Sequence, residues 1–309
     1  RCRVGWRRWA VELYDRSVSG EDVFRFEDYE RELRFHPVAT DGGTRLDGDQ
    51  LAAFNEDGYL SPLPCLSAAE ADDLRRYMDE LIETVVSADD RRNSYSINNY
   101  HRVCRGLHDL VRTPVLVDYV TDILGPEAVC WSVHAFAKLP HDRMAVPLHQ
   151  DANYWPFTPS RSVTAWLAVD DVTVENAAIR FVPGSHLRGP LDHDELALDG
   201  SVVLNRRVAD HERFAETFDN ELQAGELSLH TDLLLHGSDA NSSDRRRCGI
   251  AIRYLGAEVR TVPGAEAWAS SSVHVRSGDP SGYWPDLPRP DGEEPERMAR
   301  FIGGFDGNR

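Results

Sequence analysis

The chain contains 309 residues and has a formal net charge of −18 at pH 7, with 52 acidic side chains against 34 basic ones. Nucleic acids bind through basic surfaces, so this balance argues against a nucleic-acid partner. The sequence has no apolar run long enough to cross a membrane and no signal peptide, and its five cysteines lack a paired metal-binding spacing, so we expect a cytoplasmic protein with reduced thiols and no membrane partner.

Two helices are predicted in the first half of the chain. Ser67 and Glu70 form a capping box, and apolar residues follow at helical spacing as far as Leu81. Thr113-Pro114 and Gly125-Pro126 mark the start and the end of a second helix. No linker or change of composition separates these helices from the C-terminal half of the chain. We therefore expect one large domain in which the helices buttress a sheet.

Alternation of apolar and polar residues predicts a series of strands after the second helix. The first of them ends at Lys138, the only lysine in the chain, which shares a face with His134 and Phe136. The apolar run Leu233–Leu235 is predicted to end a buried strand, directly before His236. That first strand is Val129–Lys138. The other predicted strands are the stretch from Met144 that leads into an aromatic turn, Val163–Val169, Ala178–Val182 and Arg247–Tyr254.

Residues 46–292 are assigned to this domain, with 1–45 as an N-terminal extension of unassigned role and 293–309 as a C-terminal tail. We expect the predicted strands to form a barrel. A segment near the C-terminus is predicted to fold back over its mouth, comprising Val273–Asp279 and Tyr283–Pro285. Asp291–Glu296 is acidic and contains proline, so we expect this segment to be loosely held.

His149 and Asp151 carry the strongest indication of a metal site. Residues two apart on an extended strand point to the same face, so these two side chains can bind one ion. One more imidazole would complete a facial triad, the geometry of non-haem Fe(II) oxygenases. His236, His230 and His186 compete for this position. We favour His236 because it follows a buried apolar run, whereas His230 precedes a polar turn and His186 follows Pro-Gly-Ser, where backbone groups can satisfy it.

Arg247 is a candidate anchor for an anionic ligand. A guanidinium matches a carboxylate bidentately and stays charged at any working pH. The alternative is a solvated cluster, since Arg245 and Arg246 precede it. Strand alternation favours the anchor, because Arg247 shares a face with Gly249, Ala251 and Arg253, and the small residues leave room for a ligand.

In this combination the chain resembles the phytanoyl-CoA dioxygenase family of Fe(II)/2-oxoglutarate oxygenases, including its bacterial natural-product hydroxylases and halogenases. The likeness runs from about Leu51 to Pro290, and Ala177 stands where the family usually has glycine, a departure that we expect to touch a turn and not the chemistry. The matching stretches are Leu148–Pro156, Glu175-Asn176, Val182–His186, Leu235–Ser238 and Arg247–Tyr254.

The resemblance implies a mainly β fold, a double-stranded β-helix of the jelly-roll or cupin-like kind with buttressing N-terminal helices. It implies iron held by His149, Asp151 and His236, and the distal carboxylate of 2-oxoglutarate bound by Arg247, eleven residues after His236. O2 is the second co-substrate.

Several further residues are candidates for the co-substrate or substrate site, and most of them also have a structural interpretation. The resemblance places Lys138 near the co-substrate, although a lysine at a strand end is ordinarily a solvated edge residue. Trp166 is similar to a tryptophan of the 2-oxoglutarate pocket, or it is core packing. Arg253 could act deeper in the pocket. The aromatic turn after the ligands either contacts substrate or forms a structural lid; its residues are Asn153, Tyr154 and Trp155.

The reaction implied is hydroxylation of an aliphatic C–H of a small molecule, in secondary metabolism. The family's halogenases carry a small residue at the position of Asp151, so this carboxylate predicts hydroxylation. Desaturation, epoxidation or cyclisation at the same iron centre is the alternative, and a non-catalytic ligand-binding barrel is a third hypothesis. A CoA thioester or a carrier-bound substrate would need a basic groove, and beyond Arg245–Arg247 none stands out, so we favour a free small molecule.

Overall fold

The computed structural model describes residues 26–88, 90, 92–197 and 200–299. Two antiparallel sheets form the body of this region. The larger sheet has the strand order β1-β10-β5-β12-β2-β14, and the smaller has the order β3-β11-β6-β9. The strands of the larger sheet are β1 (Tyr59–Pro64), β2 (Ala128–Lys138), β5 (Ser162–Ala168), β10 (Glu226–Thr231), β12 (Arg247–Gly256) and β14 (Val273–His274). Those of the smaller sheet are β3 (Val146–His149), β6 (Ile179–Phe181), β9 (Phe218–Asn220) and β11 (His236–Ser238).

Two short ribbons complete the β-structure. They pair β4 (Phe157–Thr158) with β13 (Arg260–Thr261), and β7 (His193–Glu195) with β8 (Arg206–Val208). Residues of both main sheets meet in one apolar cluster, to which β5 contributes Trp166 and β6 contributes Phe181, so the sheets face each other. This arrangement confirms the predicted double-stranded β-helix.

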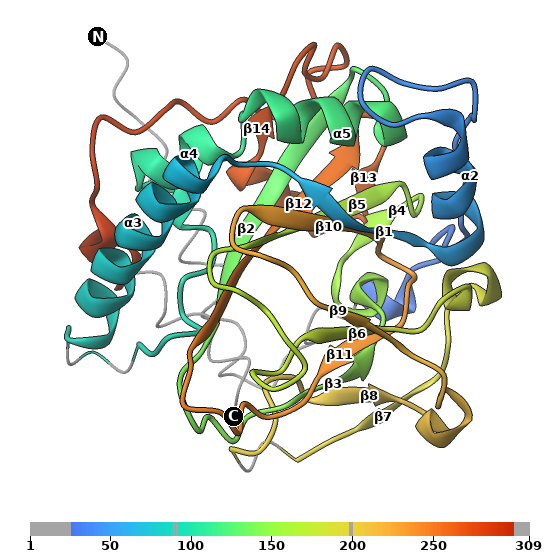
Figure 1. The fold of residues 1–309 in the computed structure, drawn as a ribbon. Helices are drawn as coiled ribbons and strands as arrows, with labels where there is room; N and C mark the ends of the chain where they lie inside the picture. Colours follow the sequence, from blue (N-terminus) through green and yellow to red (C-terminus); the bar gives the residue numbers. More distant parts are fainter. Residues whose placement is uncertain (1–25, 89, 91, 198–199, 300–309) are drawn as a thin grey trace, which may run out of the picture.

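Four α-helices are described, and three of them lie on the outer side of the larger sheet. The helices are α2 (Gly48–Asp57), α3 (Ala68–Val86), α4 (Arg105–Leu110) and α5 (Pro114–Leu124). Figure 1 shows α3, α4 and α5 on one side of the six-stranded sheet and the four-stranded sheet on the other. The predicted capping box of Ser67 and Glu70 starts α3, and Gly125 ends α5 with a positive φ of 89°. The expectation of buttressing helices is therefore confirmed.

The two faces of the larger sheet have different environments. On β12, Cys248, Ile250 and Ile252 belong to the main apolar core that lies between this sheet and the helices. The alternate residue Ala251 belongs, with Trp166 of β5, to a smaller core between the two sheets. This alternation directs Arg247 and Arg253 into the interior of the barrel.

The prediction that a strand ends at Leu235 is wrong. Leu233–Leu235 is a buried turn, and His236 begins β11 instead of ending a strand. β14 pairs with β2 at the edge of the larger sheet, and Trp284 packs with Trp131 and Phe157 in an apolar cluster, so the placement of these segments over the barrel mouth stays a prediction. The acidic segment is not loosely held, since the Glu293 carboxylate accepts hydrogen bonds from Tyr77 (2.7 Å) and the amide of Gly106 (2.8 Å).

Residues on both sides of the proposed domain boundaries pack against the same body. Met298 is buried in the main core, within η8 (Pro295–Met298). Before residue 46, Phe35 packs against that core, and Arg31 lies against the segment that follows β3. The boundaries themselves stay a prediction, and residues 1–25 and 300–309 lie outside the described residues.

Arg31 connects the N-terminal extension to the loop that carries Asp151. Its Nη1 donates hydrogen bonds to the carbonyl oxygens of Ala152 (2.8 Å) and Trp155 (2.7 Å). We expect Arg31→Gln to lower the free energy of unfolding by about 1–2 kcal/mol, because it removes two charge-assisted hydrogen bonds. Urea unfolding measures the change. Arg34→Gln is the matched control, since its guanidinium is exposed and its partner among the described residues is the neighbouring Glu32; equal stability loss in both variants would contradict the role of Arg31.

None of the described helices combines the length and apolarity of a membrane-spanning segment. The described cysteines Cys65, Cys104, Cys130 and Cys248 are not in disulfides.

Candidate metal centre

Three buried side chains converge in the smaller sheet: His149, Asp151 and His236. His149 ends β3 and lies directly opposite His236, the first residue of β11, in the antiparallel ladder. Their ring centroids are 4.2 Å apart. Asp151 is not on the strand, contrary to the expectation of a shared strand face. It is the first residue of the 3-10 turn η4 (Asp151–Tyr154), which turns the carboxylate back toward both imidazoles.

The hydrogen bonds of the two histidines fix which ring nitrogen faces the site. Nδ1 of His149 donates to the carbonyl of Pro147 (2.8 Å), and Nδ1 of His236 donates to that of Leu234 (2.9 Å). A carbonyl can only accept, so each neutral ring carries its proton on Nδ1 and presents the lone pair of Nε2. This is the arrangement by which proteins orient metal-ligating histidines.

The ligand atoms are close enough to share one ion. The Asp151 carboxylate lies 3.4 Å from Nε2 of His149 and 3.9 Å from Nε2 of His236, and the three ligand atoms lie within 4.8 Å of one another. Burial raises the pKa of Asp151, but the charge of Arg253 and the contacts with His149 and His236 outweigh it and hold the pKa below its usual value. Burial also lowers the pKa of His236 to about 4, which keeps this ring neutral. Two imidazoles and a carboxylate fit Fe(II).

Gln150, between the two ligands, holds the turn in place. This fully buried side chain donates to the carbonyls of Gly189 (2.9 Å) and Leu233 (2.7 Å) and accepts from the amide of Leu191 (2.8 Å). Sequence reasoning missed this role. The signal available was its position between two ligands, where a side chain that points away from the ion must be satisfied by the neighbouring loops.

Arg247 lies in the barrel interior with 1% of its surface exposed, so it is not part of a solvated cluster. Its guanidinium contacts the Trp166 ring at 5.5 Å, and its Nη2 donates to Ser238 Oγ (3.3 Å). Burial lowers the pKa of Arg247 to about 10, which still leaves it charged at neutral pH. A buried charge with no paired carboxylate among the described residues is suited to an anionic ligand.

Ala177 contacts Arg247 through its backbone. Its carbonyl accepts a hydrogen bond from Nε of Arg247 (3.2 Å), and its φ of 73° lies in the left-handed region that favours glycine. Residue 177 lies in a turn, as expected, and its contact with Arg247 is made by a backbone carbonyl that a glycine would also offer, so the expectation that the departure does not touch the chemistry stays a prediction.

Gly249 gives Trp166 its place beside Arg247. A Cβ at this position would lie 2.0 Å from Cζ2 of Trp166. We expect Gly249→Ala to displace the indole and to lower the free energy of unfolding by about 1–3 kcal/mol, the usual cost of overpacking a core. Thermal and urea unfolding measure this loss. Gly292→Ala is the control, because a Cβ there meets open space; a Gly249 variant as stable as this control would contradict the close packing.

Lys138 is fully buried, so the interpretation as a solvated edge residue is wrong. Its Nζ donates to the backbone carbonyls of Met144 (2.9 Å) and Asp239, and reaches that of Ser238 at 3.5 Å. Burial, followed by the nearby charge of Arg247, lowers the pKa of Lys138 to about 7. The side chain thus holds three strand ends together next to Arg247, and its contact with the co-substrate stays a prediction.

The three residues of the aromatic turn, Asn153, Tyr154 and Trp155, make different contacts. The Asn153 amide bonds to His193 and to the carbonyl of Leu191 (3.3 Å), so it anchors the turn to β7. The Tyr154 ring lies 5.6 Å from that of His149, edge to face. The Trp155 ring, buried in a third apolar cluster, lies 5.3 Å from the guanidinium carbon of Arg253. Of the three, Tyr154 lies against a metal ligand.

Two further polar residues of the larger sheet lie beside the triad: Arg253 next to Asp151, and His230 next to His236. Nε of Arg253 lies 3.7 Å from Oδ2 of Asp151, an ion pair without a hydrogen bond. The His230 ring lies 4.7 Å from that of His236, but among the described residues the group close enough to share an ion contains His236 and not His230, so His236 stays the predicted third ligand. His186 instead bonds to the carbonyl of Asn55 (3.1 Å), as expected for a residue satisfied by backbone groups.

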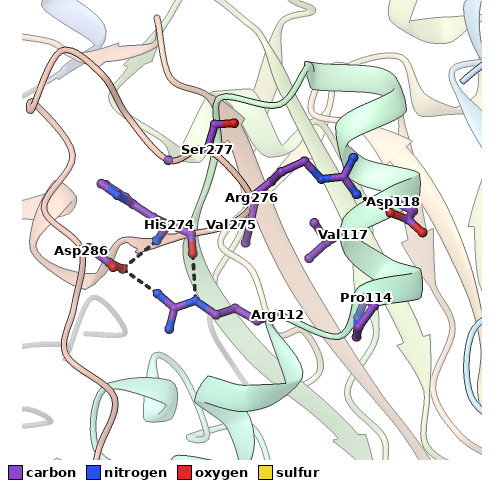
Figure 2. Close-up of a pocket in the computed structure, with 10 residues that line it drawn as sticks. Arg112, Pro114, Val117, Asp118, His274, Val275, Arg276, Ser277 and Asp286 are labelled. Carbon is purple, nitrogen blue, oxygen red and sulfur yellow. Dashed lines mark hydrogen bonds and ion pairs between the residues drawn. The ribbon is translucent and has the colours of Figure 1, made fainter. Parts of the chain in front are cut away.

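A surface hollow of about 560 Å³ lies away from the triad, between α5 and β14. Figure 2 shows that its charged side chains pair with one another. Arg112 binds Asp286 (2.7 Å), and Arg276 binds Asp118. Because these charges are already paired, the hollow does not compete with the triad as the functional site.

Known proteins resemble the chain over this same region. The family model described as phytanoyl-CoA dioxygenase (PhyH) matches residues 54–249. A probable phytanoyl-CoA dioxygenase of Caenorhabditis elegans is 25% identical over 237 residues, 69% of this chain and 76% of the relative. L-Proline trans-4-hydroxylase of Streptomyces griseoviridis is 26% identical over 235 residues, 67% of this chain and 85% of the relative.

Solved structures share the fold. The apo form of ThoJ, a non-heme monooxygenase, superposes with a TM-score of 0.68 at 25% identity, covering 82% of this chain and 93% of that one. EctD from S. alaskensis, solved with 2-oxoglutarate and 5-hydroxyectoine, gives a TM-score of 0.62 at 21% identity, covering 78% and 89%.

Proposed function

The chain belongs to the phytanoyl-CoA dioxygenase family of Fe(II)/2-oxoglutarate oxygenases, and on this premise we propose that it hydroxylates an aliphatic C–H of a small molecule in secondary metabolism. The observation that carries the proposal is the convergence of His149, Asp151 and His236 in an interior that also contains the buried Arg247. A metal site and a carboxylate anchor in one barrel are what an enzyme of this kind needs.

Each residue has a defined task in this reaction. When bound, Fe(II) and 2-oxoglutarate supply the activation of O2, with succinate, CO2 and the alcohol as products. The triad holds the metal, with both Nδ1 protons fixed by backbone carbonyls. Arg247 binds the far carboxylate of the co-substrate beside Trp166, which forms a wall of its site. The low exposure of these groups excludes water, which strengthens each charged contact.

Asp151 supports hydroxylation over chlorination, because the family's halogenases carry a small residue at this position. The likeness to an L-proline hydroxylase supports a small, free substrate. Tyr154 beside His149 and Arg253 beside Asp151 are the residues that we propose for substrate contact, with Trp155 supporting Arg253.

The proposal is tested by anaerobic titration of the metal-free protein with Fe(II) and then with 2-oxoglutarate. We expect the visible charge-transfer band of the chelate, and its loss or weakening in His236→Ala and Arg247→Ala. A substrate screen that detects succinate follows, and product analysis separates hydroxylation from desaturation, epoxidation or cyclisation. Absence of the band in the intact protein would favour the ligand-binding barrel over an oxygenase.

A further inference from the structure

A row of polar side chains crosses the inner face of the larger sheet beside the triad. Cross-strand pairing places His230 of β10 opposite Thr164 of β5, and Thr164 opposite Arg253 of β12. Directly opposed residues of neighbouring strands lie side by side on the same face. Of these three residues, His230 extends toward the smaller sheet, where its ring lies 5.2 Å from that of Phe181. We call these three residues the interior row.

The interior row has polar atoms without hydrogen-bond partners among the described residues. They are both ring nitrogens of His230, Oγ1 of Thr164 and Nε of Arg253. The first two residues are 2% and 1% exposed. Buried polar groups in folded proteins are almost always satisfied, so several unsatisfied groups in one row indicate a place built for a polar ligand.

The charge of the interior row indicates the sign of that ligand. Arg253 has one close anion among the described residues, the carboxylate of Asp151 at 3.7 Å. Once that carboxylate ligates a divalent cation, it no longer balances the guanidinium, and a positive excess remains in a low-dielectric interior. An anion of the substrate restores the balance. Arg253 and Thr164 can both donate to it, and neutral His230 adds one donor nitrogen.

We propose that His230, Thr164 and Arg253 bind an oxyanion of the substrate, which is therefore a small carboxylate or a comparable oxyanion such as a phosphonate. The inference rests on the proposed function and adds the chemical class of its substrate. Because His230 lies against His236 and Arg253 against Asp151, an oxyanion bound by the interior row would lie beside the triad. The interior row thus positions the substrate.

The test uses ligand-observed NMR on the full chain loaded with Mn(II) and saturating 2-oxoglutarate. The probes are propionate, butyrate and benzoate, each compared with its primary amide. Paramagnetic Mn(II) speeds the relaxation of protons that bind near it, so the readout reports both binding and position without turnover. We expect enhanced relaxation for the carboxylates and not for the amides. Equal enhancement for the amides would overturn the proposal.

Variants of the interior row assign the effect to its residues. We expect Arg253→Gln and His230→Phe to weaken carboxylate binding about tenfold or more, Thr164→Val about threefold, and Arg253→Lys to retain part of it. Arg245→Gln is the control, since it removes the same charge from an exposed site paired with Glu175. Unchanged carboxylate binding in the Arg253 and His230 variants would overturn the proposal.

Affinities for Mn(II) and 2-oxoglutarate, measured by calorimetry, separate the remaining outcomes. Removing a positive charge beside Asp151 should maintain or tighten Mn(II) binding in Arg253→Gln, whereas a merely structural role would weaken it. A parallel loss of 2-oxoglutarate binding would show that the interior row holds the co-substrate's carboxylate instead of the substrate's. If the intact chain binds neither Mn(II) nor 2-oxoglutarate, the proposed function itself fails.

Discussion

Replacing Asp151 by alanine is expected to weaken metal binding strongly and to abolish hydroxylation. The carboxylate is the one anionic ligand of the triad, and an imidazole binds a metal ion in its neutral form, without adding a balancing charge. Without it, Arg253, whose Nε lies 3.7 Å from the carboxylate, would present an unbalanced positive charge to an incoming cation. The effect should exceed the roughly 10–100-fold loss that results when an outer residue of a metal site is removed. Calorimetric titration with Mn(II) and the Fe(II)/2-oxoglutarate absorption band measure it.

Asp219→Ala is the matched control for this experiment. Asp219 is an exposed carboxylate on β9 of the same sheet, so its removal changes the net charge equally without touching the triad. Asp151→Gly should behave like Asp151→Ala. Hydroxylation that persists at the normal rate in either variant would rule out Asp151 as a ligand.

The residue types of the site could be predicted from the sequence, but their local structure could not. His149, Asp151 and His236 were found from spacing and resemblance. The turn at Asp151 was missed because a strand pattern does not show where the strand stops. Leu233–Leu235 is a buried turn, and a short apolar run has the same appearance in a strand as in any other buried segment.

The interior row could not be predicted, because it depends on strand register. His230, Thr164 and Arg253 are separated by dozens of residues in the chain, and they become neighbours through the pairing of β10 with β5 and of β5 with β12. A single sequence gives the face of each strand but not the register between strands. Lys138 was uncertain for a different reason, since lysine is almost never fully buried unless its hydrogens are taken by partners, here backbone carbonyls.

Replacing Arg247 by alanine is expected to weaken 2-oxoglutarate binding about 100-fold or more while leaving Mn(II) affinity within a few-fold. Truncating one partner of a buried, hydrogen-bonded charge pair costs about 2–5 kcal/mol, and Arg247 is fully buried. Arg247→Lys keeps the charge but loses the bidentate geometry, so we expect an intermediate loss. Calorimetry on the Mn(II)-loaded protein measures both affinities, with the exposed, ion-paired Arg245 replaced by alanine as the control.

A second ligand shows whether Arg247 acts on the distal carboxylate and not on the fold. 2-Oxobutyrate has the same 2-oxo acid group as 2-oxoglutarate but lacks that carboxylate. The intact chain should bind 2-oxoglutarate much more tightly than 2-oxobutyrate, and Arg247→Ala should bind the two nearly equally. A general structural defect, for instance through the lost hydrogen bonds to Ala177 and Ser238, would weaken both ligands together and preserve their ratio. A preserved ratio would therefore place the anchor for the distal carboxylate elsewhere in the barrel.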